Sequence, residues 1–538
     1  MKEILYLIFL PAFAGVLAYF VNRLRNELNF IGFFLTLFFS VELFIVTRTR
    51  IIAYSMCIIP GISFRFYLDS LSGLILLFNS TVAILIWFYS LRAMSKMPRE
   101  RVYYLYVAIT LSMANAIVVS GNFLMVIPAL IVLTFLIYRL LLISKKDSSR
   151  AARRAIATIG LAILLILSGI GLLLIKHGLA LNLPFEPRLG FDNALSVTSF
   201  ILMSIGALIQ AGAVPSQIWT AEAATVVPAS TMAFIPASLN NLLGIYLLIR
   251  ICYFVFNLSN SIPLRLILMT IGSATILVAV IKAVTQNEAM RLLSFHTVSQ
   301  VGFMILGIGT GTPVGVAGGL FHMINNVICK TGLFFATGSV EFRTKTTQLG
   351  DLSGIRTKMP FTALSFVIAA LAISDIPPLN CFYSKWMLYQ GVIELSRKTI
   401  LWPIFLLAMI SGSILALISL MKMVYLLFLK KRLRKSNRVC ETRFEMVMTT
   451  LILAFVCVVF GIFVNQVPLS KLIYPSLPFA FQKFGFGSST LATLLVMAGF
   501  FVGLVILIFG KIVKQQSSQA SMNTIISDEK GKINDLGE

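Results

Sequence analysis

Long apolar runs recur from one end of the chain to the other, and they limit the fold more than any other feature. A run of about 17 to 25 mainly apolar residues has the length of a helix that crosses a bilayer. We expect fifteen such helices, near residues 4–22, 28–46, 70–92, 103–119, 122–143, 155–175, 195–213, 228–255, 263–284, 289–309, 314–338, 361–394, 399–428, 445–465 and 489–513. Because backbone polar groups in lipid must be satisfied within the protein, the runs predict an all-α polytopic membrane protein of about 14–15 transmembrane helices.

Composition and motifs exclude several classes of function. Of the 538 residues, 58% are hydrophobic and only 12% are charged, which is unlike a soluble globular protein. The net charge of +24 comes from short loops between apolar runs, so it predicts membrane topology and no nucleic-acid partner. The six cysteines are scattered without CxxC pairs, and the chain has no GxGxxG or GxxxxGK[ST] sequence. We therefore expect no cofactor and no metal in this chain.

The distribution of basic residues predicts the orientation in the membrane. Lys and Arg gather in the loops after the third, fifth, eleventh and thirteenth predicted helices, whereas the connections at 120–122, 251–262 and 310–313 contain none. The positive-inside rule then predicts a multi-pass cell-membrane protein with its N-terminus outside and its C-terminus cytoplasmic. The second loop, with Arg48, Arg50 and Arg65, is the exception. The polar tail at 514–538 lacks an apolar face, which predicts a disordered cytoplasmic end.

A polar stripe runs along the apolar helix expected at 314–338. His322, Asn326 and Lys330 are spaced four residues apart, so their side chains share one helical face. A charged group at the bilayer centre costs about 2.5 to 3.5 kcal/mol, and it therefore normally faces protein or a water-filled cavity. The stripe is a candidate ion path. Alternatively, His322 and Asn326 form hydrogen bonds between helices and Lys330 extends to an interface.

Two of the expected helices are interrupted. The sequence QAGAVP at 210–215 ends one apolar run, and the segment 374–380, with Asp375 and two prolines, interrupts another just before Lys385. Unwound backbone at membrane depth is tolerated where it lines a cavity or is buried in protein, so paired breaks indicate an ion path between two internal repeats. The alternative is a pair of proline kinks that only fit their neighbours.

Four motifs follow one another in the second half of the chain. They are RLLSFHTVSQVG at 291–302, GGLFHMINNVICKTGLFFATGSV at 318–340, GDLSG at 350–354 and IPPLNCFYSKW at 376–386. This series resembles the antiporter-like proton-channel subunits, a family shared by respiratory complex I, membrane-bound hydrogenases and multisubunit Na⁺/H⁺ antiporters. The resemblance is strong from about 286 to 390, and weaker but collinear from 68 to 250.

The resemblance implies a fold with two inverted five-helix repeats, each with one broken helix. On this pattern residues 1–102 form three N-terminal helices, 103–255 the first repeat, 256–428 the second repeat, 429–513 the C-terminal helices and 514–538 the tail. Lys330 and Lys385 then occupy the lysine positions of the family's proton path, and His322 the first histidine of its FHxxxH pattern. A lysine deprived of water can exchange protons near neutrality, which suits this role.

Several positions depart from the family pattern. Asn326 replaces the second histidine, and Asp375 and Cys381 replace two glycines around the break. We expect Asp375 to act as the counter-ion of Lys385, because a pair at about 4 Å and an effective dielectric near 20 gains about 4 kcal/mol.

The first repeat lacks the titratable residues of the family. Ile131 stands where the family has a glutamate, Gln210 where it has a lysine, and Pro236 lies in the helix that carries a lysine or histidine in relatives. Isoleucine cannot titrate, and glutamine cannot hold a proton as a charge. The first repeat is therefore degenerate, and the second retains the path through His322, Lys330 and Lys385.

The resemblance implies a membrane subunit of a complex I-like NADH-quinone oxidoreductase or of a membrane-bound hydrogenase-like complex. Such a subunit is not itself redox-active. It takes part in proton translocation coupled to electron transfer elsewhere, so its expected partners are other membrane subunits and a redox peripheral arm. Two alternatives remain: a subunit of a multisubunit Na⁺/H⁺ antiporter, and a transport-inactive structural spacer with the same fold.

Overall fold

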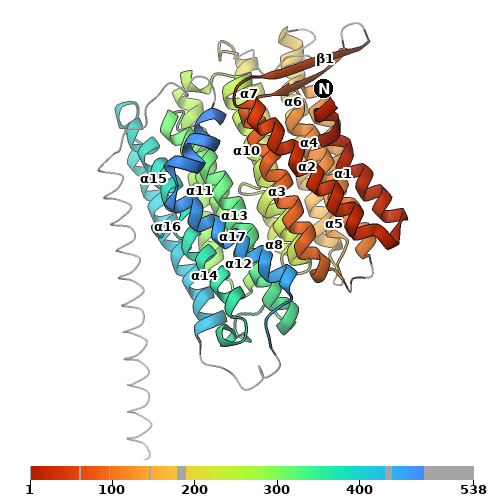
Figure 1. Ribbon diagram of the computed structural model, residues 1–538. Coiled ribbons are helices and arrows are strands. Elements are labelled where there is room, and N and C mark those ends of the chain that lie inside the picture. Colours follow the sequence, from red (N-terminus) through yellow and green to blue (C-terminus); the bar gives the residue numbers. More distant parts are fainter. Residues whose placement is uncertain are drawn as a thin grey trace, which may run out of the picture.

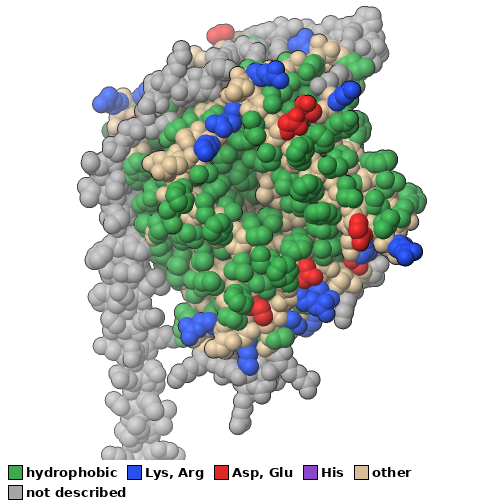
Figure 2. All heavy atoms as spheres, viewed as in Figure 1, with side chains coloured by type: hydrophobic (Ala, Val, Ile, Leu, Met, Phe, Trp, Pro, Cys, Tyr) green, Lys and Arg blue, Asp and Glu red, His purple; other side chains and the backbone are tan. Residues whose placement is uncertain are grey.

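The fold is a bundle of long helices, many of them tightly packed side by side (Figure 1). The computed structural model describes residues 2–59, 62–95, 97, 99–144, 147–177, 189–352, 354–430 and 439–477. Twelve helical segments in this described part are long and apolar enough to cross a membrane. On the face seen in Figure 2, hydrophobic side chains cover the middle of the molecule, and charged side chains gather toward its two ends. The chain is a multi-pass membrane protein.

The N-terminal part is helical except for one hairpin. Its elements are α1 (Lys2–Phe20), η1 (Asn22–Leu24), α2 (Arg25–Thr47), β1 (Ile52–Ile59), β2 (Ile62–Leu68) and α3 (Ser70–Ala93). The expectation of a plain loop between the second and third helices is wrong, because β1 and β2 pair antiparallel there. The hairpin lies against the α4–α5 connection, where the Gly121 amide donates to the Arg65 carbonyl at 2.6 Å. The alternating ISFRFYL sequence of β2 is typical of a strand with one packed face.

The next part contains the first interrupted helix. Its elements are α4 (Glu100–Val119), α5 (Phe123–Leu141), α6 (Ser149–His177), α7 (Ala194–Ala211), α8 (Ile218–Ala223), α9 (Ala229–Phe234), η3 (Ile235–Leu239), α10 (Asn240–Arg250) and η4 (Ile251–Val255). The chain leaves α7 through Gly212, which adopts a positive φ of 89°. Glycine tolerates this left-handed conformation because it has no β-carbon. The break predicted at 210–215 is present.

The following part holds the second interrupted helix. Its elements are η5 (Leu258–Asn260), α11 (Ile262–Thr285), α12 (Ala289–Gly309), α13 (Pro313–Thr344), η6 (Ile355–Thr357), α14 (Pro360–Ile373), α15 (Asn380–Ile393), η7 (Glu394–Arg397), α16 (Trp402–Val424), η8 (Tyr425–Leu429), α17 (Phe444–Ile462), η9 (Asn465–Ile473) and η10 (Tyr474–Ser476). The break predicted between α14 and α15 is present. The expected helix near 489–513, the tail at 514–538 and loop residues 431–438 lie outside the described residues.

Burial separates an interior group of helices from those that face outward. Every residue of α10 is buried, as is every residue of α13 from Val314 to Val340. In α12 only Arg291 is not buried. Helices α1, α2 and α6 instead expose large apolar side chains such as Phe13, Phe38 and Leu164. The polar stripe of α13 therefore faces protein on all sides.

A buried ion pair joins α10 to the start of α3. Arg250 ends α10 and is fully buried, and its two terminal nitrogens donate to the carboxylate oxygens of Asp69 at 2.8 and 2.6 Å. Asp69 also caps α3 by accepting from the amide of Ser72 at 2.9 Å. The ring of Phe254 covers the guanidinium at 4.3 Å. Bidentate geometry of this kind stabilises a buried pair that would otherwise lose its hydration without compensation.

Candidate functional site

The stripe residues of α13 lie at the centre of the molecule. His322, Asn326 and Lys330 are each 0% exposed. Within the described part of the chain, neither the Nζ atom of Lys330 nor the two amide atoms of Asn326 have a hydrogen-bond partner. A buried ammonium without a partner is costly, so hydrogen bonding within the described residues does not explain why a lysine occupies position 330.

His322 has a partner at each ring nitrogen. Nε2 lies 2.9 Å from Oε1 of Gln300 on α12, and Nδ1 lies 3.0 Å from the hydroxyl oxygen of Ser384 on α15. A carbonyl-type oxygen accepts only, so Nε2 donates. The Ser384 hydroxyl donates either to Nδ1 or to the Cys381 carbonyl at 3.0 Å, and in the second case its oxygen accepts from a protonated Nδ1. The same contacts therefore suit both the neutral ring and the charged ring. His322 links α13 to α12 and α15.

The α14–α15 break contains an ion pair. The Nζ atom of Lys385 lies 2.9 Å from Oδ2 of Asp375 and 3.3 Å from the hydroxyl oxygen of Ser413 on α16. It also sits 4.4 Å from the ring centre of Phe303 on α12. Each of these three contacts stabilises the charged ammonium. The pairing of Asp375 with Lys385 that we predicted is present in the structure.

Asp375 occupies a conformation in which glycine is more common. Its φ is 63°, in the left-handed region, where aspartate and asparagine are tolerated better than other non-glycine residues. A carboxylate therefore fits at this backbone position and brings an acidic group to the break.

Two asparagines hold the start of α15 against α13. The Asn325 amide donates to the Asn380 carbonyl at 3.1 Å, and the Asn380 side chain donates to Oδ1 of Asn325 at 3.0 Å. Oδ1 of Asn380 also accepts from the Cys381 amide at 3.0 Å, one of the backbone N–H groups that have no helical partner at the start of α15. The break is thus a defined structure fastened to the helix that carries Lys330.

Three buried cysteines meet beside this junction. The sulfur of Cys329 lies 3.7 Å from that of Cys381 on α15 and 3.5 Å from that of Cys457 on α17. All three are free thiols. No group of three or more His, Cys, Asp or Glu side chains among the described residues is arranged to hold a metal ion. The three cysteines are far apart in the sequence, and they meet only because the helices that carry them pack together.

The region around the α7–α8 break is polar but neutral. Gln210 lies in the last turn of α7 and is 2% exposed, and neither amide atom has a partner among the described residues. Pro236 is buried in η3. Ile131 differs from both, because it is 52% exposed on the outer face of α5. Ile131, Gln210 and Pro236 therefore do not line one continuous path through the interior.

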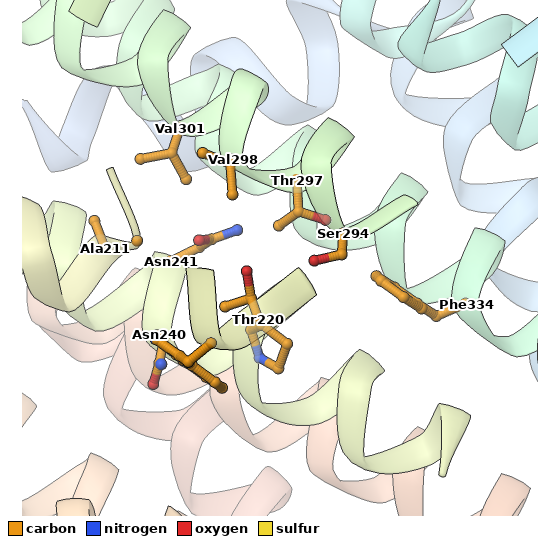
Figure 3. A pocket seen from close by; sticks show the side chains of 12 residues that line it. Ala211, Thr220, Asn240, Asn241, Ser294, Thr297, Val298, Val301 and Phe334 are labelled. Atoms are coloured by element: carbon orange, nitrogen blue, oxygen red, sulfur yellow. The ribbon is translucent and has the colours of Figure 1, made fainter. Parts of the chain in front are cut away.

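A small cavity lies where α8 and α10 meet α12 (Figure 3). Its free volume is about 10 Å³, which is about the space for one water molecule. Its polar lining comes from Thr220 on α8, Asn240 and Asn241 on α10, and Ser294 and Thr297 on α12. None of these side chains titrates near neutrality. The cavity can hydrogen-bond a water, but its own lining cannot store a proton.

Comparison with known proteins decides the family. Residues 122–414, more than half of the chain, match the family described as NADH:quinone oxidoreductase/Mrp antiporter, TM. The chain belongs to this family. The matched region starts just before α5 and ends within α16, so it includes both broken helices and all of α13.

Relatives of this antiporter-family chain are subunits of different complexes. It is 29% identical over 300 residues to NADH-quinone oxidoreductase subunit N of Desulforudis audaxviator, covering 53% of this chain and 58% of the relative. It is 27% identical to Na(+)/H(+) antiporter subunit A1 of Staphylococcus haemolyticus, in an alignment that covers 75% of this chain and 53% of the relative. It is 28% identical to formate hydrogenlyase subunit 3 of Escherichia coli, in an alignment that covers 49% of this chain and 46% of the relative. These alignments span about half the length of the relatives.

Solved structures share the fold. The Mrp complex from Dietzia sp. contains a chain with a TM-score of 0.80 at 21% identity, covering 92% of this chain and all of that one. Respiratory complex I from Thermus thermophilus contains one with a TM-score of 0.77 at 18% identity, covering 90% of this chain and all of that one. The predicted membrane fold of the antiporter-like family is confirmed.

Several residues of the site were not predicted from the sequence. Gln300 and Ser384 lie inside the quoted motifs but carry no charge, and their role as partners of His322 depends on helix rotation. Asn325 was passed over for its neighbour Asn326, although Asn325 makes the contact with α15. A buried amide next to a helix break was the available signal, since freed backbone groups need partners.

Proposed function

We propose that this chain is a proton-translocating membrane subunit of a complex I-like or membrane-bound hydrogenase-like complex, coupled to electron transfer in partner subunits. The observation that carries the proposal is the Lys385–Asp375 ion pair within the α14–α15 break. A buried lysine whose counter-ion sits on unwound backbone can change its protonation when that backbone moves. A second buried lysine and a histidine lie on the adjoining α13.

The geometry gives each group a distinct part in proton movement. Asp375, Ser413 and the Phe303 ring stabilise the charged form of Lys385. Separation or protonation of Asp375 removes the largest of these contacts and favours release of the proton from Lys385. Lys330 lacks such partners among the described residues, so its charge depends more strongly on its surroundings. His322 accommodates either protonation state through Gln300 and Ser384.

The proposed partners are further membrane subunits and a redox peripheral arm. The structurally similar chains come from multisubunit membrane complexes, the Mrp complex and respiratory complex I. We propose that electron carriers reside in the partners and that this chain binds none. We also propose that residues 256–428 form the conducting repeat, and that the N-terminus is outside and the C-terminus cytoplasmic.

A second candidate is a subunit of a multisubunit Na⁺/H⁺ antiporter without a redox arm. The specific support is the alignment with the antiporter subunit A1, which extends over 75% of this chain. Copurification in mild detergent distinguishes the two candidates. Flavin, iron–sulfur or nickel proteins bound to the chain would support the redox complex, and a purely membranous assembly would support the antiporter.

Substitution of the lysines tests transport itself. The purified complex is reconstituted into vesicles, a K⁺ diffusion potential is imposed with valinomycin, and an internal dye reports proton flux per subunit. Lys385→Met and Lys330→Met should each lower the flux by about tenfold or more, because a positioned proton-transferring group typically contributes about 100-fold. Gln210→Ala is the matched control in the first repeat and should retain most of the flux. Unchanged flux with Lys385→Met in a fully assembled complex would support the alternative that the chain is a transport-inactive structural spacer.

A further inference from the structure

A second buried histidine lies on α12, which packs against both α13 and α16. His296 is on α12 and is 0% exposed, with Nε2 2.6 Å from the hydroxyl oxygen of Ser419 on α16. Its other ring nitrogen, Nδ1, has no hydrogen-bond partner within the described part of the chain.

The contacts of Ser419 favour one tautomer of neutral His296. The Ser419 hydroxyl donates to the carbonyl of Ala416 at 2.9 Å. With its hydrogen in that bond, its oxygen accepts from Nε2–H of His296. The neutral ring in this tautomer presents the lone pair of Nδ1 as a proton acceptor.

His296 shares a face of α12 with two residues of the site. Gln300 is one turn away and binds His322, and Phe303 is two turns away and lies beneath the ammonium of Lys385. The positions i, i+4 and i+7 fall on one helical face. His296 therefore lies on the face of α12 that contacts His322 and Lys385.

Polar groups continue from His296 toward one end of the bundle. Lys422 is three residues after Ser419 on α16, and its Nζ atom lies 2.9 Å from the Gln286 carbonyl and 3.0 Å from Oδ1 of Asn287. Asn287 is exposed in the α11–α12 connection. His296 is two turns into α12, between this connection and the buried lysines.

We propose that His296 is an additional proton carrier, which holds a proton at Nδ1 between the buried lysines and the α11–α12 end of the bundle. This inference rests on the proposed transport function. The proton adds to Nδ1 to give the imidazolium and leaves from it again, so the ring is unchanged after each transfer. Ser419 is a positioning residue that keeps Nε2 protonated and Nδ1 open.

The decisive variant is His296→Gln in the vesicle assay described above. Glutamine can keep a hydrogen bond to Ser419 but cannot hold a proton as a charge, so flux should fall by about tenfold or more. Ser299→Ala is the matched control, because Ser299 is also buried on α12 but bonds to the Ile276 carbonyl of α11. It should retain wild-type flux.

A second variant separates lost proton transfer from lost structure. His296→Ala leaves space at the ring position, and imidazole added to the vesicles should restore flux to the assembled complex. Wild-type flux with His296→Gln, or no recovery of His296→Ala with imidazole, would overturn the proposal. If Lys385→Met lowers flux while His296→Gln does not, only this inference fails. If Lys385→Met also has wild-type flux, the proposed function fails.

Discussion

The Nζ atom of Lys385 lies 2.9 Å from Oδ2 of Asp375, although the two residues belong to opposite sides of a helix break. The two residues are ten positions apart, so the ion pair joins the two sides of the break locally. The φ of Asp375 is 63°, in the left-handed region where glycine is more common. The counter-ion of Lys385 therefore lies on the connection between α14 and α15, outside both helices.

Asp375→Asn should destabilise the assembled chain. Asparagine tolerates the left-handed backbone, so the variant removes the charge with little added strain. Breaking a buried pair by removing one partner typically costs about 3 to 5 kcal/mol, because the remaining charge is unpaired. The measurement is the fraction of protein that stays monodisperse in detergent after heating. The double variant Asp375→Asn with Lys385→Met should recover stability but not proton flux; no recovery would mean that the pair is not what the single variant disrupts.

The charged residues and the two breaks could be predicted from the sequence, because lysine, aspartate and paired prolines are rare in apolar spans. Their partners could not be. Gln300, Ser384 and Asn380 approach α13 from sequence distances of 22 to 62 residues, and these contacts depend on how whole helices rotate against one another. Periodicity places a residue on a face, but it does not identify the facing helix.

The hairpin and the cysteine cluster were missed for different reasons. The apolar and aromatic residues of β1 and β2 lie between two long apolar runs, so they appear as a loop when only spans of membrane length are sought. Cys329, Cys381 and Cys457 have no local spacing, and only tertiary packing joins them. The Asp69–Arg250 pair was missed in the same way, because its members are 181 residues apart.

Arg250→Met should weaken the attachment of α10 to α3. The substitution leaves the Asp69 carboxylate without its bidentate partner, which typically costs about 3 to 5 kcal/mol. Heating in detergent should therefore aggregate the variant at a lower temperature than the unmodified protein. Adding Asp69→Asn should restore part of the loss, because asparagine can still cap α3 without leaving a charge unpaired. Equal stability of all three proteins would show that the pair contributes little.

Gly461→Ala should disturb the break from outside. Gly461 on α17 packs directly on the α14–α15 connection, where an added β-carbon would overlap the Pro378 carbonyl oxygen and lie 2.8 Å from the Cα atom of Leu379. Overpacking of this kind typically costs about 1 to 3 kcal/mol. Gly171→Ala is the control, since nothing lies within 4 Å of its added β-carbon. On heating in detergent, Gly461→Ala should aggregate at a lower temperature than the unmodified protein, and Gly171→Ala should not. Equal stability of the two variants would show that the break accommodates the added β-carbon without loss of stability.

Cysteine labelling should determine the orientation of the bundle. Cys440 is exposed and follows a segment with six basic residues between positions 430 and 438, so we expect it on the cytoplasmic side. In a Cys57→Ser background, a membrane-impermeant maleimide should label Cys440 only after the cells are permeabilised. A positive control is Thr49→Cys in the background Cys57→Ser and Cys440→Ser. It should label in intact cells, because Thr49 is exposed just before β1, at the end of the bundle where Figure 1 shows the hairpin. If Cys440 is labelled in intact cells and Thr49→Cys is not, the orientation is the opposite of the one that we propose.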